Sequence, residues 1–126
     1  MASHIPINLF HLLVVAPFFI YVAFMRGQLV PWIFHILLGL GLLVLVYHAY
    51  KTAIKWNASS MSVWVNIIHV ILVGPLLIYI GAKSYDTPRW AYEVLAMTGF
   101  AAGGYHLYSM ILQLQEMHAV PKVQSS

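Results

Sequence analysis

Residues 8–22 read NLFHLLVVAPFFIYV, and residues 66–80 read NIIHVILVGPLLIYI. The alignment continues without a gap as far as residue 51 and contains 12 identities over 44 positions. Apolar matches arise from composition alone in so hydrophobic a chain, whereas matches of Asn, His, Pro, Trp and Tyr do not. The informative identities are of this second kind: Asn8/Asn66, His11/His69, Pro17/Pro75, Tyr21/Tyr79, Trp32/Trp90, Tyr47/Tyr105, His48/His106 and Tyr50/Tyr108. We therefore expect a duplication, with repeat one at 8–51 and repeat two at 66–109.

The composition is that of an integral membrane protein. Of the 126 residues, 62% are hydrophobic and only 7% are charged, and the mean hydropathy is +0.84. Soluble domains carry about 25% charged residues. Four apolar runs are each long enough to cross a hydrocarbon layer of about 30 Å as a helix: 6–25, 31–51, 62–83 and 89–111. None of them alternates as a barrel strand would, so helices are expected.

The duplication also predicts the architecture. Each repeat crosses the membrane twice, so both copies have the same orientation and are related by a pseudo-twofold axis along the membrane normal. The expected fold is an all-α, antiparallel four-helix membrane bundle made from a duplicated helical hairpin. It forms a single transmembrane domain over 1–126, with a disordered tail from about 117 to 126.

This topology places both termini on the same side of a multi-pass protein. The basic residues divide three against three between the two sides, so the orientation and the host membrane stay open. The expected partner is the lipid bilayer, and a homo-oligomer remains an alternative to the single chain. The net charge of +3 is small and spread out, which speaks against binding to nucleic acid.

Four histidines are expected at one depth. In an antiparallel hairpin, residues equidistant from the turn lie at the same level, and this rule groups His11 with His48 and His69 with His106. Polar neighbours of the same layer are Asn8 and Asn66, one turn further out, and the flanking tyrosines Tyr47, Tyr50, Tyr105 and Tyr108. Ionisable residues inside membranes are costly and usually face the interior of the protein. The layer is therefore a candidate functional site.

Imidazole is a common ligand of Zn, Cu and Fe, and the chain has no cysteine to offer instead. The layer predicts a site for a transition metal or haem b, with the asparagines and tyrosines as hydrogen-bonding partners of the ligating rings. Either His48 and His106 ligate one haem iron from opposite sides, or all four imidazoles surround one ion. Two haems are not expected, because His35 and His48 lie about 140° apart around their helix. Metal handling or electron transfer would follow.

The alternative function is an oligomeric proton or small-ion channel. His35 falls opposite Glu93 in the duplication, near the other membrane surface and close to the level of Tyr21 and Tyr79. A His/Glu pair can pass protons, and this layer would gate the path to the four histidines. The two layers are about 20 Å apart at 1.5 Å per helical residue, so conduction would need a file of water.

A structural membrane assembly protein is the third reading. An enzyme is not favoured, because no Ser–His–Asp set is present and the only carboxylates are Asp86, Glu93 and Glu116. The mid-span prolines Pro17 and Pro75 predict kinks that shape the bundle, with a hinge or pore-lining role as the alternative.

The stretches HVILVGPLLIYIGAK (69–83) and RWAYEVLAMTGFAAGGYHLY (89–108) resemble uncharacterised small four-span membrane proteins encoded by large DNA viruses and marine microbes. The resemblance covers most of the chain. It implies no particular activity and points only to the source of the chain.

Overall fold

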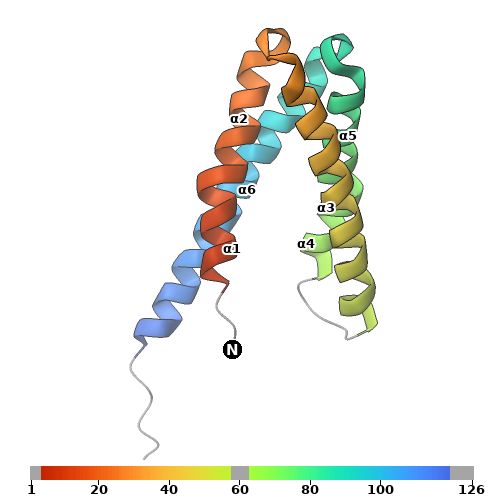
Figure 1. Cartoon of the computed structure of the whole chain (residues 1–126). Coiled ribbons are helices and arrows are strands. Elements are labelled where there is room, and N and C mark those ends of the chain that lie inside the picture. Colours follow the sequence, from red (N-terminus) through yellow and green to blue (C-terminus); the bar gives the residue numbers. More distant parts are fainter. Residues whose placement is uncertain (1–3, 58–62, 120–126) are drawn as a thin grey trace, which may run out of the picture.

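The computed structural model describes residues 4–57 and 63–119, and these form helices joined by short turns, without a strand among them. The α-helices of the described residues are labelled in Figure 1. Their bounds are α1 Ile5–Phe10, α2 Ala16–Met25, α3 Pro31–Asn57, α4 Val63–Ile68, α5 Gly74–Lys83 and α6 Arg89–His118. The expected disordered tail begins at about 117, but α6 continues to His118; residues 120–126 lie outside the described part.

Three continuous helical stretches in the described residues are long and apolar enough to cross a membrane: Ile5–Gln28, Pro31–Ile54 and Val63–Asp86. The chain is thus a helical protein with the features of a membrane protein. The fourth long helix, α6, is not among the three, since glycines, tyrosines and polar residues such as Thr98 dilute its apolar character.

The two halves of the chain pass through the same succession of helix types. A short α-helix leads into a five-residue π-helical segment, His11–Val15 in the first half and His69–Val73 in the second. The π turn closes with the amide of Ala16 bonded to the carbonyl of His11, and that of Gly74 bonded to His69. The next residue is a proline in each case, which has no N–H to continue the ladder. Pi-helical turns are frequent at functional sites.

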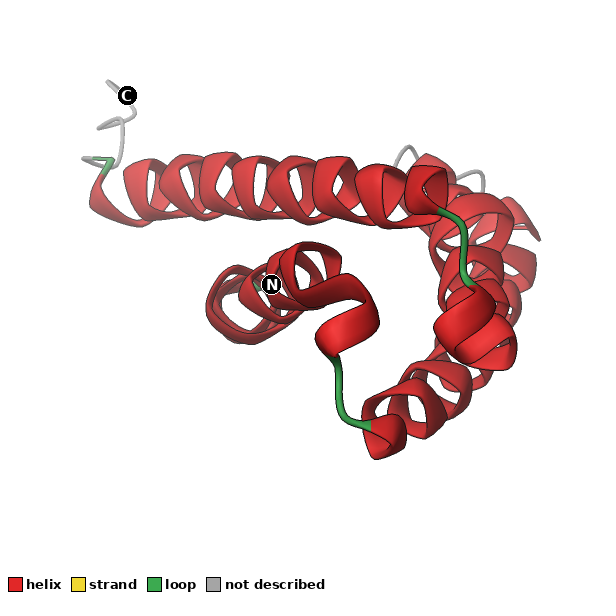
Figure 2. Ribbon diagram, turned by 90° about the horizontal axis from the view of Figure 1, so that it is seen from above, coloured by secondary structure: helices red, strands yellow, loops and turns green. Residues whose placement is uncertain are grey.

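The helices pack as two antiparallel pairs. One pair consists of α1 and α2 against α6, and the other of α4 and α5 against α3. Each pair combines a helix of the first half with a helix of the second. The two pairs are close at the end where α2 meets the start of α3 and separate toward the opposite end, giving a V (Figure 1). The view from above in Figure 2 shows the same divergence, so the arrangement is more open than the compact bundle that the sequence predicts.

The hydrophobic core occupies the closed end of the V. It draws fully buried side chains from all four long helical stretches, including Val22, Leu37, Leu77 and Leu95. The polar histidine layer lies beyond this core, toward the open end. The core therefore holds the two pairs together and leaves the other end free to form a cavity.

Glycines bring the helices of each pair into close contact. A Cβ atom on Gly41 would lie 2.8 Å from the backbone nitrogen of Ile78, and one on Gly99 would lie 3.0 Å from the side chain of Ile20. Gly41 matches Gly99, and Ile20 matches Ile78, when the sequence is shifted by 58 residues. Small residues at such positions let helices approach closely in membranes.

The two turns at the closed end have the same backbone conformation at their first residue. Arg26 and Ser84, which directly follow α2 and α5, have φ angles of 48° and 54°, a region that residues other than glycine rarely adopt. The hydroxyl of Tyr85 donates to the carbonyl of Leu29 at 2.8 Å and so ties the second turn to the first.

Candidate functional site

The four histidines of the predicted layer come together in a row. The ring of His106 stacks on that of His11, with centroids 4.2 Å apart. His11 faces His69 at 6.3 Å with the ring planes at 88°. His69 in turn stacks on His48 at 4.1 Å. The row is symmetric about the gap between His11 and His69, which match each other when the sequence is shifted by 58 residues and come from different helix pairs.

The two inner rings are held by their own helices. Nδ1 of His11 is 2.8 Å from the carbonyl oxygen of Ile7, and Nδ1 of His69 is 2.6 Å from that of Val65. A carbonyl oxygen only accepts hydrogen bonds, so each Nδ1 is the donor. In the neutral rings Nε2 then carries the lone pair that binds a metal.

The two outer rings are held across the helix pairs. Nδ1 of His106 donates to Oδ1 of Asn8 at 2.8 Å, and Nδ1 of His48 donates to Oδ1 of Asn66 at 2.9 Å. Both asparagines are buried, with 3% and 5% of their surface exposed. The amide of Asn8 also donates to Ser109 at 3.3 Å. The predicted asparagine partners thus contact the histidines of the neighbouring helix.

The predicted tyrosine partners divide into two groups. Tyr47 meets the ring of His48 edge-on at 5.0 Å, and Tyr105 meets that of His106 at 5.2 Å. Tyr50 and Tyr108 lie on exposed faces of their helices. The contacts of Tyr47 and Tyr105 are ring contacts rather than hydrogen bonds.

A cavity of about 470 Å³ surrounds the row in the open end of the V. All four histidines and both asparagines line it. Its walls include the apolar side chains of Ile7, Phe10 and Val65 and the ring of Tyr105.

A second cavity, also about 470 Å³, lies between the third helical stretch and α6. It shares His69 and His106 with the first cavity and is otherwise lined mainly by apolar residues, among them Leu72, Val73 and Met97. Leu72 and Val73 follow His69 in the chain and Met97 precedes His106, so the second cavity extends from the histidine layer toward the closed end.

The histidines do not form a cage for a bare ion. Within residues 4–57 and 63–119, no three or more His, Asp or Glu side chains are arranged so that they could hold one metal ion.

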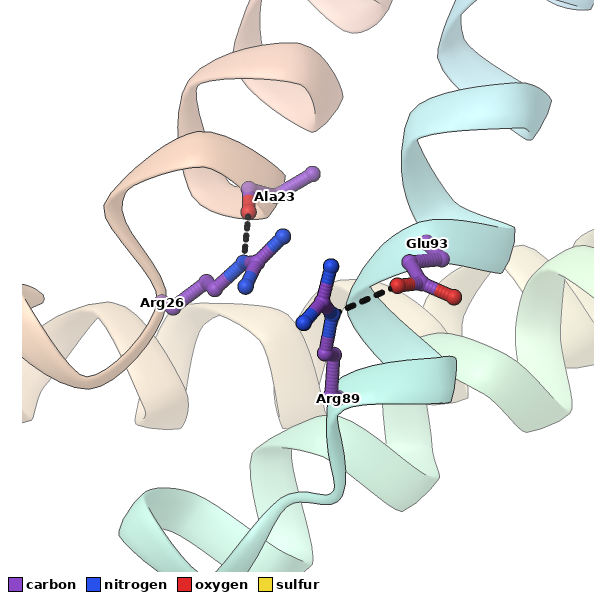
Figure 3. A network of polar contacts seen from close by, with 4 residues as sticks. All are labelled: Ala23, Arg26, Arg89 and Glu93. Carbon is purple, nitrogen blue, oxygen red and sulfur yellow. Dashed lines mark hydrogen bonds and ion pairs between the residues drawn. The ribbon is translucent and has the colours of Figure 1, made fainter.

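The residues of the predicted second layer, at the closed end, do not form a cluster as the four histidines do. This layer consists of His35, Glu93, Tyr21 and Tyr79. Glu93 forms an ion pair with Arg89, one helical turn earlier, at 2.7 Å (Figure 3). The Nε–H of Arg26 donates a hydrogen bond to the carbonyl oxygen of Ala23. His35 and Tyr21 are exposed on their helices. Tyr79 stacks on Trp90 at 5.5 Å.

Sequence reasoning did not find several of these partners. The i, i+4 spacing of Arg89 and Glu93 is a signal for an ion pair that was available. The backbone carbonyls of Ile7 and Val65 cannot be recognised as partners from the sequence, because every residue has a carbonyl. The contact of Asn8 with Ser109 depends on the pairing of two helices whose contacting residues are 101 positions apart.

Comparison of the chain with protein-family models, curated proteins and solved structures gave no match.

Proposed function

We propose that the protein binds one haem b in the cavity between the two helix pairs, with His11 and His69 as the axial ligands of the iron. The observation that carries this proposal is the geometry of the central histidine pair. The rings come from opposite helix pairs, are 6.3 Å apart, and each has its Nδ1 bonded to a backbone carbonyl.

The separation matches that of two imidazoles that share one metal. A ring nitrogen lies about 1.1–1.2 Å from the ring centroid and a metal–nitrogen bond is about 2.0–2.1 Å, which gives centroids about 6.2–6.6 Å apart. Donation of Nδ1–H to a carbonyl or similar acceptor is the usual arrangement for a ligating histidine, because it orients the ring and selects the tautomer.

Haem suits the site better than a bare ion. A porphyrin supplies four nitrogen ligands of its own, so two imidazoles complete the coordination of the iron. A bare ion would need further protein ligands, and the described residues offer no group of three. The cavity volume of about 470 Å³ is in the range of small-molecule sites, whereas an ion needs far less room.

The outer histidines would then support the ligands. His106 and His48 stack on the two axial rings, and Asn8 and Asn66 hold them in place. With both axial positions filled by the protein, the iron suits electron transfer rather than binding of a small molecule.

The proposed site implies a four-span topology. We propose that α6 is the fourth span and that the two halves arose by duplication of one hairpin. The repeated π-helical segments, the aligned glycine contacts and the matching backbone of Arg26 and Ser84 support this. The pseudo-twofold axis would then pass between His11 and His69.

The contacts of the described residues support proton conduction less than they support haem binding. It requires His35 and Glu93 to act together, and Glu93 is paired with Arg89 on an exposed face instead. The fully buried apolar residues between the two layers include Leu37 and Leu95, which offer no group that passes a proton.

The test is the visible spectrum of the protein purified in detergent after expression with a haem supply. The parent protein is expected to have a Soret band and about one haem per chain. His11→Ala and His69→Ala are each expected to lose it, because each removes an axial ligand. The matched control is His35→Ala, which removes an exposed histidine at the other end of the molecule and is expected to retain full haem.

His11→Met separates loss of a ligand from loss of the fold. Methionine can ligate haem iron and raises the reduction potential, so this variant is expected to keep haem at a higher potential than the parent. His106→Ala is expected to weaken haem binding about 10–100-fold, the usual effect of a residue that supports a ligand. Haem retained in both alanine variants of the central pair, or a parent protein without haem, would refute the proposal.

A further inference from the structure

The described residues that line the first cavity carry no carboxylate. The charged residue among them is Lys51, and the remaining polar groups are imidazoles, amides and hydroxyls. Lys51 follows His48 by three residues on α3, so it lies about 4.5 Å from the histidine layer along the helix, on the side of the termini. Its ammonium group is 5.8 Å from the centre of the Tyr47 ring.

The site is therefore amphipathic as a whole. Its end nearer the termini has the positive charge of Lys51, and the second cavity continues from His69 and His106 toward the closed end with an apolar lining. A ligand that fills both parts must have an anionic edge and an apolar edge. Haem has both, in its two propionates and in the vinyl-bearing side of its ring.

The two halves differ at this point. Position 51 is lysine in the first repeat, and the aligned position 109 is serine, whose hydroxyl accepts from Asn8. A symmetric pocket would receive a ligand equally in either of two orientations related by the pseudo-twofold axis. A single lysine on one side gives the two orientations of the ligand different binding free energies.

We infer that Lys51 is the carboxylate-binding residue of the site, selecting a ligand with a free propionate and orienting it with its acidic edge toward the termini. This inference rests on the proposed haem site and adds to it the group that recognises the ligand. An ammonium–carboxylate contact that is partly shielded from water contributes more than an exposed ion pair.

The experiment compares ferric protoporphyrin IX with its dimethyl ester, in which both propionates are neutral. Haem-free protein in detergent is titrated with each compound, and binding is followed by the Soret band. The parent is expected to bind the free acid about tenfold more tightly than the ester. Lys51→Gln is expected to reduce the affinity for the free acid to that for the ester while leaving the ester unchanged. The matched control, Lys83→Gln, lies at the closed end and is expected to match the parent.

The outcomes separate the two proposals. Equal affinity for acid and ester in the parent protein would overturn the role of Lys51 and leave the haem site intact. A Lys51→Gln variant that loses affinity equally for both compounds would also overturn it, because the lysine would then act on the fold rather than on the carboxylate. Failure of the parent to bind either compound would refute the haem site itself and this inference with it. Lys51→Arg, which keeps the charge, is expected to retain the preference for the acid.

Discussion

Asn8 connects two helices at the level of the histidines. Its side-chain oxygen accepts from His106 and its amide donates to Ser109, while 97% of its surface is buried. Leucine has nearly the same size but no polar atom. It would leave the buried ring of His106 without this acceptor, and an unsatisfied buried polar group is costly.

At this residue scale, Asn8→Leu is expected to destabilise the protein by about 1–3 kcal/mol. Thermal unfolding in detergent, followed by circular dichroism, measures the change. The control is Gln28→Leu, an exposed amide in the first turn, which is expected to stay within about 0.5 kcal/mol of the parent. Equal stability of the two variants would show that the Asn8–His106 contact contributes nothing to the fold.

At the scale of the helical elements, the contact between α3 and α5 depends on glycine. A Cβ atom on Gly81 would lie 2.5 Å from the backbone nitrogen of Leu38 and 2.7 Å from the carbonyl oxygen of Phe34. Both atoms belong to the backbone of α3, so they cannot rotate away as a side chain would. The two helices would have to separate.

Gly81→Ala is therefore expected to destabilise the protein by about 1–3 kcal/mol, the usual cost of overpacking. The matched control is Gly39→Ala, since a Cβ atom there meets nothing within 4 Å. Alanine is the better helix former by about 1 kcal/mol, so the control is expected to be neutral or stabilising. The melting temperature of Gly81→Ala is expected to fall below that of the parent, and that of Gly39→Ala to stay the same or rise. An equal change in both variants would contradict the close packing of α3 and α5.

The π-helical segments also belong to this scale. A π turn contains one more residue than the α turn that it replaces. It therefore rotates His11 and His69 by about 100° relative to the helix that follows. This rotation sets which face the two rings occupy. A uniform α-helical periodicity does not include this rotation.

At the scale of the whole molecule, the V places its open end and its cavity on one side. The start of α1, which follows His4, and the end of α6 lie at the open end, whereas the turns after α2 and α5 lie at the closed end (Figure 1). These turns contain Gln28 and Asp86. If all four long helical stretches span the membrane, these two groups of residues lie on opposite sides.

The chain has no cysteine, so single cysteines can report this topology without background. His4→Cys and Met117→Cys are expected to react with a membrane-impermeant maleimide from the same side of sealed vesicles. Gln28→Cys and Asp86→Cys are expected to react only from the opposite side. Labelling of Met117→Cys and Gln28→Cys from the same side of the vesicles would mean that α6 does not cross the membrane, and the four-span proposal would fail.

Much of the architecture follows from local properties of the sequence. The apolar runs predict the long helices because a chain in lipid must bond its own backbone, and equal distances from the hairpin turns predict one level for the four histidines. The clustering of His11, His48, His69 and His106 is confirmed by their ring contacts. The ligand of this layer stays a prediction.

The sequence by itself determined the helical class, the long apolar stretches and the grouping of four imidazoles, because these depend on hydropathy and on distance along the chain. Only the tertiary structure decided that helices pair across the two halves, and that His11 faces His69 while the outer histidines stack on them. Those features depend on helix rotation and on the π turns. A shift by one residue around a helix changes which side chains meet, while it leaves their depth and hydropathy almost unchanged.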